Sequence, residues 1–334
     1  MHVLIIGGTR FVGYLLTWRL LACGHRVTLV TGGTLTDPFA DRVERLRCDR
    51  KSADFARLLR GRHFDAAVDF AAYKGADARQ AVEVLGGGAV GHYVFVSSGQ
   101  VYLVREQCAR PAQESDYDGP LMPEPTDAKE WEEWDYGMGK RAAEDVLDEA
   151  WHSRRFPGTR LRIPMVNGER DYYRRIESYL WRILDGGQVL LPDGGTEPTR
   201  HVYGWDVATA ISRLLGQSTT FGQAYNLCQE DSPTLAELVD LMAATLGADN
   251  RSMAVPRAML QNAGIAPEEI SPFSGRWMSF LVPAKAKQNL DWQPQRAGIY
   301  VPKVVMSFLA SPPAGPPNNY RHRPTELALA ARLR

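Results

Sequence analysis

Tyr136 and Lys140 have the residue types and the spacing of an acid–base pair. They stand four positions apart at the start of a predicted helix, residues 137–150, so both side chains would lie on one helix face. A neighbouring ammonium group stabilises phenolate and lowers the pKa of a tyrosine from its usual value of about 10. The pair therefore predicts a general acid–base, although the spacing alone is more typical of a solvated surface pair.

A glycine-rich segment near the N-terminus has the composition of a phosphate-binding turn. It follows a predicted strand (2–6) and opens a predicted helix (11–21). Glycine lets the backbone turn tightly and approach a pyrophosphate, and the helix N-terminus adds N–H groups and partial positive charge. We expect a dinucleotide site here rather than a purely structural turn. The segment consists of Gly7, Gly8, Thr9, Arg10, Phe11, Val12 and Gly13.

Two serine hydroxyls, Ser97 and Ser98, end another predicted strand, residues 93–97. Doubly wound sheets bind their ligands at the carboxyl ends of the strands. This position makes Ser98 a candidate substrate-binding residue. Considered alone, two serines after a strand are more typical of a turn or a helix cap.

The first half of the chain alternates apolar runs with helical patterns, which predicts βαβ units and a parallel sheet. The fold class is therefore α/β, a Rossmann-like doubly wound parallel sheet. The predicted strands are residues 2–6, 26–30, 43–48, 66–70, 93–97 and 160–163, and the predicted helices are 11–21, 52–59, 76–85 and 137–150.

The second half is less regular and predicts a smaller mixed domain. Helices are expected at 172–184, 205–215 and 234–246, with a strand at 224–227. We expect a dinucleotide-binding domain over 1–165 with return elements from about 200–230, and a substrate-binding part over 166–310. Residues 311–334 are predicted to form a Pro-rich spacer and a short helix, 325–332. Thr325 is expected to be the N-cap of that helix, which would dock onto its own chain or onto a partner.

Composition excludes several function classes. Of 334 residues, 44% are hydrophobic and 23% are charged, which is typical of a globular protein. Lys+Arg and Asp+Glu both number 39, so no basic excess favours nucleic acid or an acidic membrane. The sequence predicts neither a transmembrane run nor a signal peptide. Four scattered cysteines predict reduced thiols, neither zinc nor another metal site, and a cytoplasmic protein.

Taken together, the motifs resemble the extended short-chain dehydrogenase/reductase superfamily, in its NAD-dependent epimerase/dehydratase branch. The glycine-rich turn, the strand ending at 68–72, Ser98 followed by Val101 and Tyr102, and Tyr136 with Lys140 match that family in order. Later stretches at 161–168, 224–227 and 283–294 match as well. The resemblance covers nearly the whole chain, up to about residue 300.

The resemblance implies roles for individual residues. Tyr136 would be the acid–base, Lys140 would hold the nicotinamide ribose, and Ser98 would bind the substrate oxygen. Hydride transfer at a carbinol or carbonyl carbon would accompany proton transfer by Tyr136. The cofactor would be NAD(P), bound by Gly7, Gly8, Thr9, Arg10, Phe11, Val12, Gly13, Thr31, Asp49, Arg50, Phe70, Ala71, Ala72, Lys140 and Pro164.

Arg10 departs from the family pattern, because a glycine usually stands there. The Gly-Gly-Thr-Arg-Phe form is similar to a divergent subgroup that includes chloroplast stem-loop RNA-binding proteins. Those relatives tend to lose the tyrosine, whereas this chain keeps Tyr136 and Lys140. We therefore expect an NAD(P)-dependent enzyme with a small-molecule substrate and no nucleic acid. The alternative is a non-catalytic nucleotide- or RNA-binding protein.

The end of the second strand bears on the choice of cofactor. NAD-specific proteins place an acid there to bind the ribose hydroxyls, but here Thr31 and Gly32 follow the strand. Arg10 or Arg50 would be able to bind a 2′-phosphate. We therefore favour NADP over NAD.

Several positions bear on the substrate, which is expected to be a sugar, a nucleotide sugar or a small metabolite. Met165 stands where nucleotide-sugar enzymes of the family carry an asparagine, and Arg200 is one residue out of register with their diphosphate-binding arginine. Gly99 and Gln100 replace the usual Asp-Glu of dehydratases, which favours reduction or epimerisation over dehydration. The candidate substrate residues are Ser98, Gln100, Asn167 and Arg200.

Residues 116–135 form an acidic stretch that contains Trp131 and Trp134. The stretch is interpreted as a solvated loop, or alternatively as the rim of a pocket for an uncharged or cationic substrate. In the family, helices equivalent to 76–85 and 137–150 form a dimer face, so a homodimer is expected.

Overall fold

Seven parallel strands form one sheet in the order β10-β6-β5-β4-β1-β2-β3. The computed structural model describes residues 1–333, which divide into two units. Unit 1 holds this sheet and comprises Met1–Pro164, Gly204–Cys228 and Ser279–Gln293, and the rest is unit 2. The strands are β1 (His2–Ile6), β2 (Arg26–Thr31), β3 (Val43–Arg47), β4 (Ala66–Asp69), β5 (Tyr93–Ser98), β6 (Gly158–Ile163) and β10 (Ala224–Asn226).

Helices cover both faces of the sheet, as a parallel sheet of apolar strands requires. One face packs against α1 (Phe11–Ala22) and α7 (Gly204–Leu214), which contact each other. The other face packs against α2 (Ala53–Leu59), α3 (Gly75–Leu85) and α5 (Ala128–Arg154). The predicted doubly wound α/β fold is confirmed, and the strand boundaries agree with the predicted ones to within two residues.

The strand order creates a switch point at β1, which lies between β2 and β4. Helix α1, which connects β1 to β2, lies on one face of the sheet, and α2, which connects β3 to β4, lies on the other. At such a point the connecting segments leave the sheet in opposite directions and open a crevice at the carboxyl ends. The glycine-rich segment follows β1 directly, so the fold places it at this crevice.

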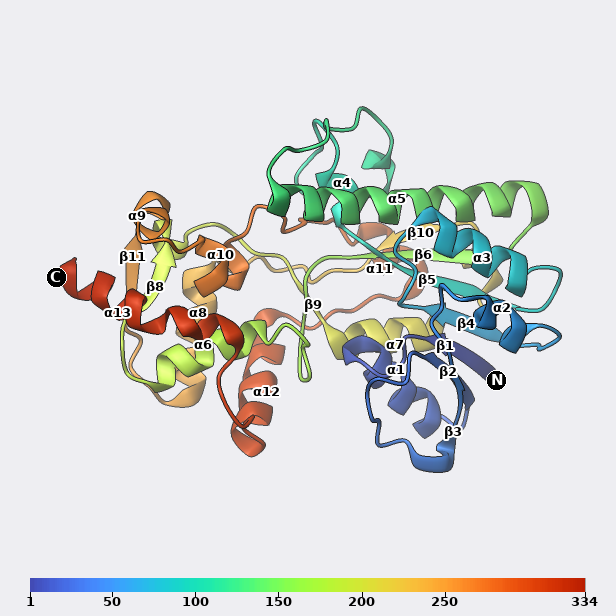
Figure 1. The fold of residues 1–334 in the computed structure, drawn as a ribbon, viewed down its shortest axis with the longest axis horizontal. Coiled ribbons are helices and arrows are strands. Elements are labelled where there is room, and N and C mark those ends of the chain that lie inside the picture. Colours follow the sequence, from blue (N-terminus) through green and yellow to red (C-terminus); the bar gives the residue numbers. More distant parts are fainter. Residues whose placement is uncertain (334) are drawn as a thin grey trace. The chain divides into compact units, whose positions relative to one another are not determined.

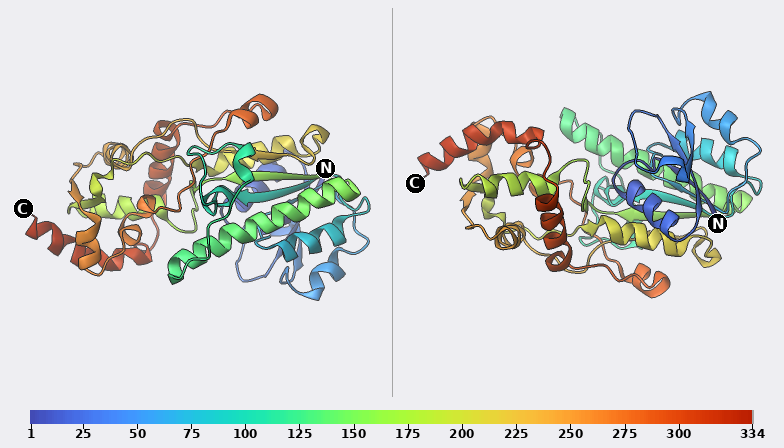
Figure 2. Two further views of the ribbon diagram at one scale, coloured as in Figure 1. Left: turned by 90° about the horizontal axis from the view of Figure 1, so that it is seen from above. Right: turned by 90° about the horizontal axis from the view of Figure 1, so that it is seen from below.

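Helix α5 is longer than predicted and begins nine residues before Gly137. Asp127 caps it, because its carboxylate accepts hydrogen bonds from the backbone N–H groups of Lys129 and Glu130, each at 3.0 Å. Tyr136 therefore lies inside a helix rather than at its start, and residues 128–135 are not a loop. The helix runs along the whole sheet (Figures 1 and 2).

Unit 2 contains two pairs of short parallel strands among helices. Strand β7 (Val166–Asn167) pairs with β9 (Val202–Tyr203), and β8 (Val189–Pro192) pairs with β11 (Ser252–Val255). The sequence did not predict β8, β11, or the helices between residues 257 and 310. The helices of unit 2 are α6 (Arg175–Leu184), α8 (Leu235–Leu246), α9 (Arg257–Asn262), α10 (Pro267–Ile270), α12 (Ala297–Ala310) and α13 (Arg323–Arg332). Unit 1 also has α4 (Gln100–Leu103) and α11 (Ala284–Leu290).

No helix within residues 1–333 combines the length and the apolar composition that a membrane span needs.

A buried ion pair holds the C-terminal helix α13 within unit 2. Arg182 of α6 donates to Glu326 at 2.7 Å, and both side chains are at most 1% exposed. Arg323 adds a second bridge to Glu326 at 3.1 Å. Thr325 is exposed and lies inside the helix, which begins at Arg323, so the predicted N-cap is wrong. The helix docks onto its own chain.

Removing one partner of a buried ion pair leaves the other charge uncompensated. We expect Glu326→Ala to lower the free energy of unfolding by about 3–5 kcal/mol, measured by urea denaturation. Thr325→Ala on the same helix is the control and should stay within about 0.5 kcal/mol of wild type. Equal stabilities of the two variants would contradict the role of the buried pair.

Candidate functional site

The glycine-rich turn after β1 is shaped by close packing that excludes side chains. Gly7 has a φ of +88°, which favours glycine. A Cβ on Gly8 would lie 2.7 Å from Leu29 Cδ2, and one on Gly13 would lie 2.6 Å from the Gly7 carbonyl oxygen. No side chain caps the N-terminus of α1. The segment thus leaves a narrow cradle with helix N–H groups beside it, which fits a pyrophosphate.

Arg10 occupies the position of the family's middle glycine without backbone strain. It has φ −119° and ψ 144°, an extended conformation open to any residue. The left-handed conformation falls instead on Phe11, with a φ of +37°. Backbone geometry therefore does not require glycine at position 10, and the exposed Arg10 side chain lies at the entrance of α1.

Lys140 is buried between the ends of β4 and β5. Its Nζ donates to the carbonyl oxygens of Ala72 (2.8 Å) and Val96 (2.9 Å). The same atom lies 4.8 Å from the ring centres of Tyr73 and Phe95. Burial lowers the pKa of Lys140 to about 8, and Asp69 and Glu144 oppose that shift without cancelling it.

Tyr136 lies beside this ammonium group. Its ring centre is 5.8 Å from Lys140 Nζ and 6.1 Å from the ring centre of Tyr73. The predicted pair is therefore brought together by one turn of α5. Tyr73 was not singled out from the sequence. The sequence signal for Tyr73 was its position directly after Ala71 and Ala72, which follow β4.

Ser98 ends β5 and is half-buried. Its Oγ accepts a hydrogen bond at 3.2 Å from the backbone N–H of Gln100, the first residue of α4. The preceding residue, Ser97, points the other way and donates to Glu144 at 2.5 Å. The two hydroxyls thus differ in their surroundings. The Ser97 hydroxyl is buried in the interior, and the Ser98 hydroxyl lies at the carboxyl edge of the sheet.

A buried network of charged and polar side chains stabilises this edge of the sheet. Arg162 of β6 donates to both carboxylate oxygens of Glu144, the shortest contact being 2.7 Å. Burial raises the pKa of Glu144, but the charge and hydrogen bonds of Arg162 outweigh burial, so the pKa is lowered overall. Arg162 also donates to the Tyr102 hydroxyl at 2.7 Å. The network joins α5, β5, β6 and α4.

Arg50 does not face a cofactor phosphate, contrary to the sequence prediction. Its guanidinium is 7% exposed and donates to Asp69 (2.8 Å) and to the carbonyl oxygen of Asp77 (2.9 Å). Asp69 in turn binds the N–H groups of Ala71 and Ala72. Arg50 therefore shapes the chain after β4, because a buried carboxylate needs a cation and hydrogen bonds.

Arg47, the last residue of β3, is exposed at this end of the sheet and was not named from the sequence. It pairs with Thr31 in the β2–β3 register, and its Cδ lies 3.6 Å from where a Cβ on Gly33 would be. Asp49 follows β3, is exposed, and accepts from the backbone N–H of Lys51. Of the remaining predicted cofactor residues, Thr9 and Val12 follow β1, Phe70 follows β4, and Pro164 follows β6.

Residues of the acidic stretch contact the site from helix α5. Glu133 accepts hydrogen bonds from the Gln100 amide through its backbone carbonyl (2.9 Å) and its carboxylate (2.5 Å). Asp135 accepts from Lys74 at 2.5 Å. The end of the stretch is thus attached to α4 and to the chain before α3, while Trp131 stays 40% exposed.

The two other predicted substrate residues lie in unit 2. The amide of Asn167 donates to His201 Nδ1 at 2.9 Å, and Arg200 donates to Ser232 Oγ at 2.8 Å. Burial lowers the pKa of His201 to about 3, so this ring is neutral at pH 7. Within residues 1–333, no three His, Cys, Asp or Glu side chains are grouped closely enough to hold a metal ion.

The lowered pKa of Lys140 has a consequence for stability. Between about pH 8 and 10.5 the unfolded chain keeps the lysine proton while the folded chain loses it, so the free energy of unfolding rises with pH. We expect wild type to gain up to about 3 kcal/mol over Lys140→Met across this window. Urea denaturation between about pH 7 and 10 measures it. Lys129→Met on the exposed start of α5 should run parallel to wild type, and a parallel Lys140→Met curve would contradict the burial of the charge.

Solved structures with the same fold come from sugar-modifying enzymes. A UDP-glucose 4-epimerase from Thermotoga maritima, solved with UDP-glucose, has a TM-score of 0.73 at 19% identity and covers 93% of this chain and 99% of that one. The dTDP-glucose 4,6-dehydratase from Bacillus anthracis, solved in complex with NAD, has a TM-score of 0.72 at 17% identity and covers 93% and 97%. At these identities the likeness shows the fold.

A sequence relative is the chloroplast stem-loop binding protein of 41 kDa b from Arabidopsis thaliana. It is 26% identical over 310 residues, which cover 88% of this chain and 75% of that protein. The family described as the NAD dependent epimerase/dehydratase family matches residues 3–228, so the resemblance found in the sequence is confirmed. Because this match spans well over half of the chain and agrees with the glycine cradle and the doubly wound sheet, the chain belongs to the NAD-dependent epimerase/dehydratase family.

Proposed function

We propose that the chain is an NAD(P)-dependent oxidoreductase or epimerase that acts on a carbinol or carbonyl centre of a sugar, a nucleotide sugar or a small metabolite. The observation that carries the proposal is the buried Lys140 ammonium beside the Tyr136 ring at the carboxyl edge of the sheet. A nicotinamide, when bound, supplies the hydride acceptor or donor. The chain supplies the groups that hold it and that move the proton.

Tyr136 is the proposed acid–base, and Lys140 its electrostatic support. A cation next to a phenol favours the phenolate, which brings the pKa of the phenol closer to the working pH. Lys140 uses two of its three donors on the Ala72 and Val96 carbonyl oxygens, which leaves one N–H for a ribose hydroxyl. Ser98 donates to the substrate oxygen from the end of β5.

The glycine cradle holds the pyrophosphate in this proposal. Gly7, Gly8 and Gly13 keep the turn narrow, and the uncapped N-terminus of α1 offers N–H groups and positive potential. Reduction or epimerisation is favoured over dehydration, since Gln100 is held by Glu133 and contributes an amide rather than a carboxylate.

A homodimer through α3 and α5 belongs to the same proposal. The two helices pack side by side on one face of the sheet. In the family, their equivalents form the dimer face.

The preferred dinucleotide is NADP, for which Arg47 and Arg10 supply the positive charge. No acid stands at the end of β2, where Thr31 is followed by Gly32 and Gly33, so nothing there repels a 2′-phosphate. Arg50 is committed to Asp69 and does not contribute. The exposed Arg47 beside Gly33 replaces Arg50 as the proposed ligand of the 2′-phosphate.

A fluorescence titration separates the two dinucleotides. Wild type should bind NADPH more tightly than NADH, and Arg47→Gln should weaken NADPH binding by about tenfold because a charge-assisted hydrogen bond is lost. NADH binding should not change. Arg26→Gln, at the amino end of β2, is the matched control and should leave both affinities unchanged. Tighter binding of NADH by wild type would refute the NADP preference.

Substitution of Tyr136 tests the catalytic assignment. We expect Tyr136→Phe to lower turnover by about 10²–10⁴-fold, because the proton-transfer group is gone while the ring remains. Its dinucleotide affinity should stay within about twofold of wild type. Turnover is followed by nicotinamide absorbance with sugar and nucleotide-sugar alcohols, with Tyr172→Phe as an exposed control. Unchanged turnover in Tyr136→Phe would remove the residue from the mechanism.

A second candidate function is RNA binding on the same fold. The likeness to the stem-loop binding protein of Arabidopsis thaliana favours it, whereas a net charge of zero does not. The Tyr136→Phe variant distinguishes the two functions. Stem-loop RNA binding that is unaffected by this substitution, together with no turnover by wild type, would favour the binding protein.

A further inference from the structure

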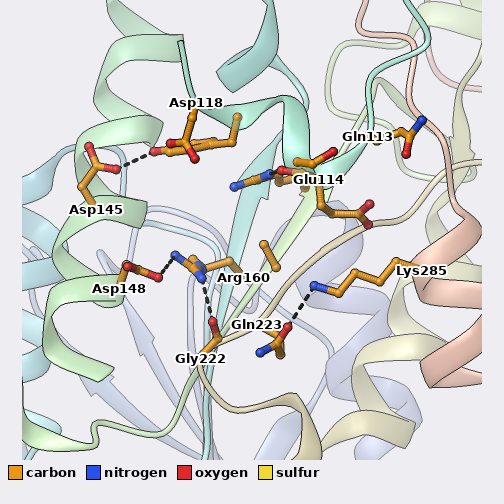
Figure 3. A pocket seen from close by; sticks show the side chains of 13 residues that line it. Gln113, Glu114, Asp118, Asp145, Asp148, Arg160, Gly222, Gln223 and Lys285 are labelled. Atoms are coloured by element: carbon orange, nitrogen blue, oxygen red, sulfur yellow. Dashed lines mark hydrogen bonds and ion pairs between the residues drawn. The ribbon is translucent and has the colours of Figure 1, made fainter. Parts of the chain in front are cut away.

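A cavity of about 610 Å³ lies in unit 1, beside strands β6 and β10 at one side of the sheet. Its walls come from the short helical turn Glu114–Tyr117, the second half of α5, strand β6, the segment that leads into β10, and α11. Figure 3 shows the side chains from these segments that line the cavity. We call it the β6–β10 pocket. Arg160, which lines it, lies three residues before Ile163 and pairs with Ala224.

Strong ion pairs fix the walls of the β6–β10 pocket. Arg160 donates to Asp148 at 2.8 Å and to the carbonyl oxygen of Gly222 at 2.7 Å. Arg162 is held by Glu144, as described above. Both guanidinium groups thus have partners within the chain, so the two arginines stabilise the pocket walls and are not assigned to ligand binding.

Lys285 differs from the two arginines, because it has no counter-ion. Its Nζ donates to the side-chain oxygen of Gln223 at 2.9 Å and lies 4.9 Å from the Tyr225 ring centre. Among residues 1–333, no carboxylate comes within 4.0 Å of this ammonium group. Burial lowers the pKa of Lys285, and Glu114 opposes that shift. A half-buried cation with unused donors favours an anionic ligand group.

Two carboxylates that form no ion pair with lysine or arginine among the described residues also line the pocket. The Glu114 carboxylate accepts one hydrogen bond, from the backbone N–H of Asn226 at 2.7 Å. Asp118 is exposed at the pocket wall (Figure 3). Neither forms an ion pair with lysine or arginine among the described residues. These groups favour a positively charged ligand group, and they disfavour a phosphate dianion.

We propose that the β6–β10 pocket is a binding site for a zwitterionic amino acid, with basic amino acids preferred. The ligand carboxylate binds the Lys285 ammonium group and the Gln223 amide, and its positive groups face Glu114 and Asp118. Carboxylates outnumber cations along the walls, which favours a ligand with an additional positive charge. The volume is within the usual range for a small-molecule site. The proposal does not depend on the catalytic assignment, since no catalytic residue lines the pocket.

Isothermal titration calorimetry of the full chain with L-arginine tests the site. Wild type should bind saturably, and Lys285→Gln should raise the Kd by at least about tenfold, because the carboxylate loses its cation. Lys287→Gln on the same helix removes an equal charge outside the pocket and should change the Kd by less than about twofold. Thermal melting checks that each variant is folded. Asp118→Asn alters an exposed side chain and should weaken binding without affecting the fold.

Two results would overturn the proposal. One is the absence of saturable binding by wild type at about 10 mM L-arginine, well above ordinary metabolite affinities. The other is equal loss of affinity in Lys285→Gln and Lys287→Gln, which would mean general charge attraction. Titration with inorganic phosphate completes the test: tighter binding of phosphate than of L-arginine would show an anion site and refute the zwitterion.

Discussion

An ammonium group sealed inside a protein needs acceptors, and for Lys140 these are the backbone carbonyl oxygens of Ala72 and Val96. Ala72 lies in the segment after β4 and Val96 lies in β5, so one lysine ties helix α5 to both of these segments. The cost of burying the charge appears in the pKa of the group, which burial lowers to about 8. The geometry at the carboxyl edge depends on this contact, because Tyr136 sits one helical turn before Lys140.

The surrounding structure keeps that contact in place through further buried charges. Glu144, one turn after Lys140 on α5, is fixed by Arg162 of β6 and by Ser97 of β5. Asp69, at the end of β4, is fixed by Arg50 and binds the N–H groups that precede Tyr73. Glu144 and Asp69 thus each have a guanidinium partner, which is the condition under which such buried charges are tolerated. These contacts hold the side chains at this edge in defined positions, which the proposed catalytic site requires.

The sheet and its flanking helices could be predicted because alternating apolar runs and glycine positions are local signals. The pairing of Tyr136 with Lys140 followed from helical spacing. Other features depend on contacts between distant segments, which spacing does not reveal. Arg50 and Arg47 are three residues apart, yet one turns inward to Asp69 and the other outward beside Gly33. The early start of α5 was signalled by Asp127, a good N-cap that an acidic stretch concealed. The β6–β10 pocket joins residues from five separate segments and has no sequence signature.

The central claim is that the phenol of Tyr136 and the ammonium of Lys140 act together on a nicotinamide held above the glycine cradle. A crystal structure of the chain with bound NADP⁺ measures this most directly. The account predicts the pyrophosphate on the Gly7–Gly13 turn, Lys140 Nζ within hydrogen-bond distance of a ribose hydroxyl, and the Tyr136 hydroxyl facing the nicotinamide ring. A dinucleotide bound elsewhere, or bound here with the Tyr136 hydroxyl directed away from the ring, would contradict it.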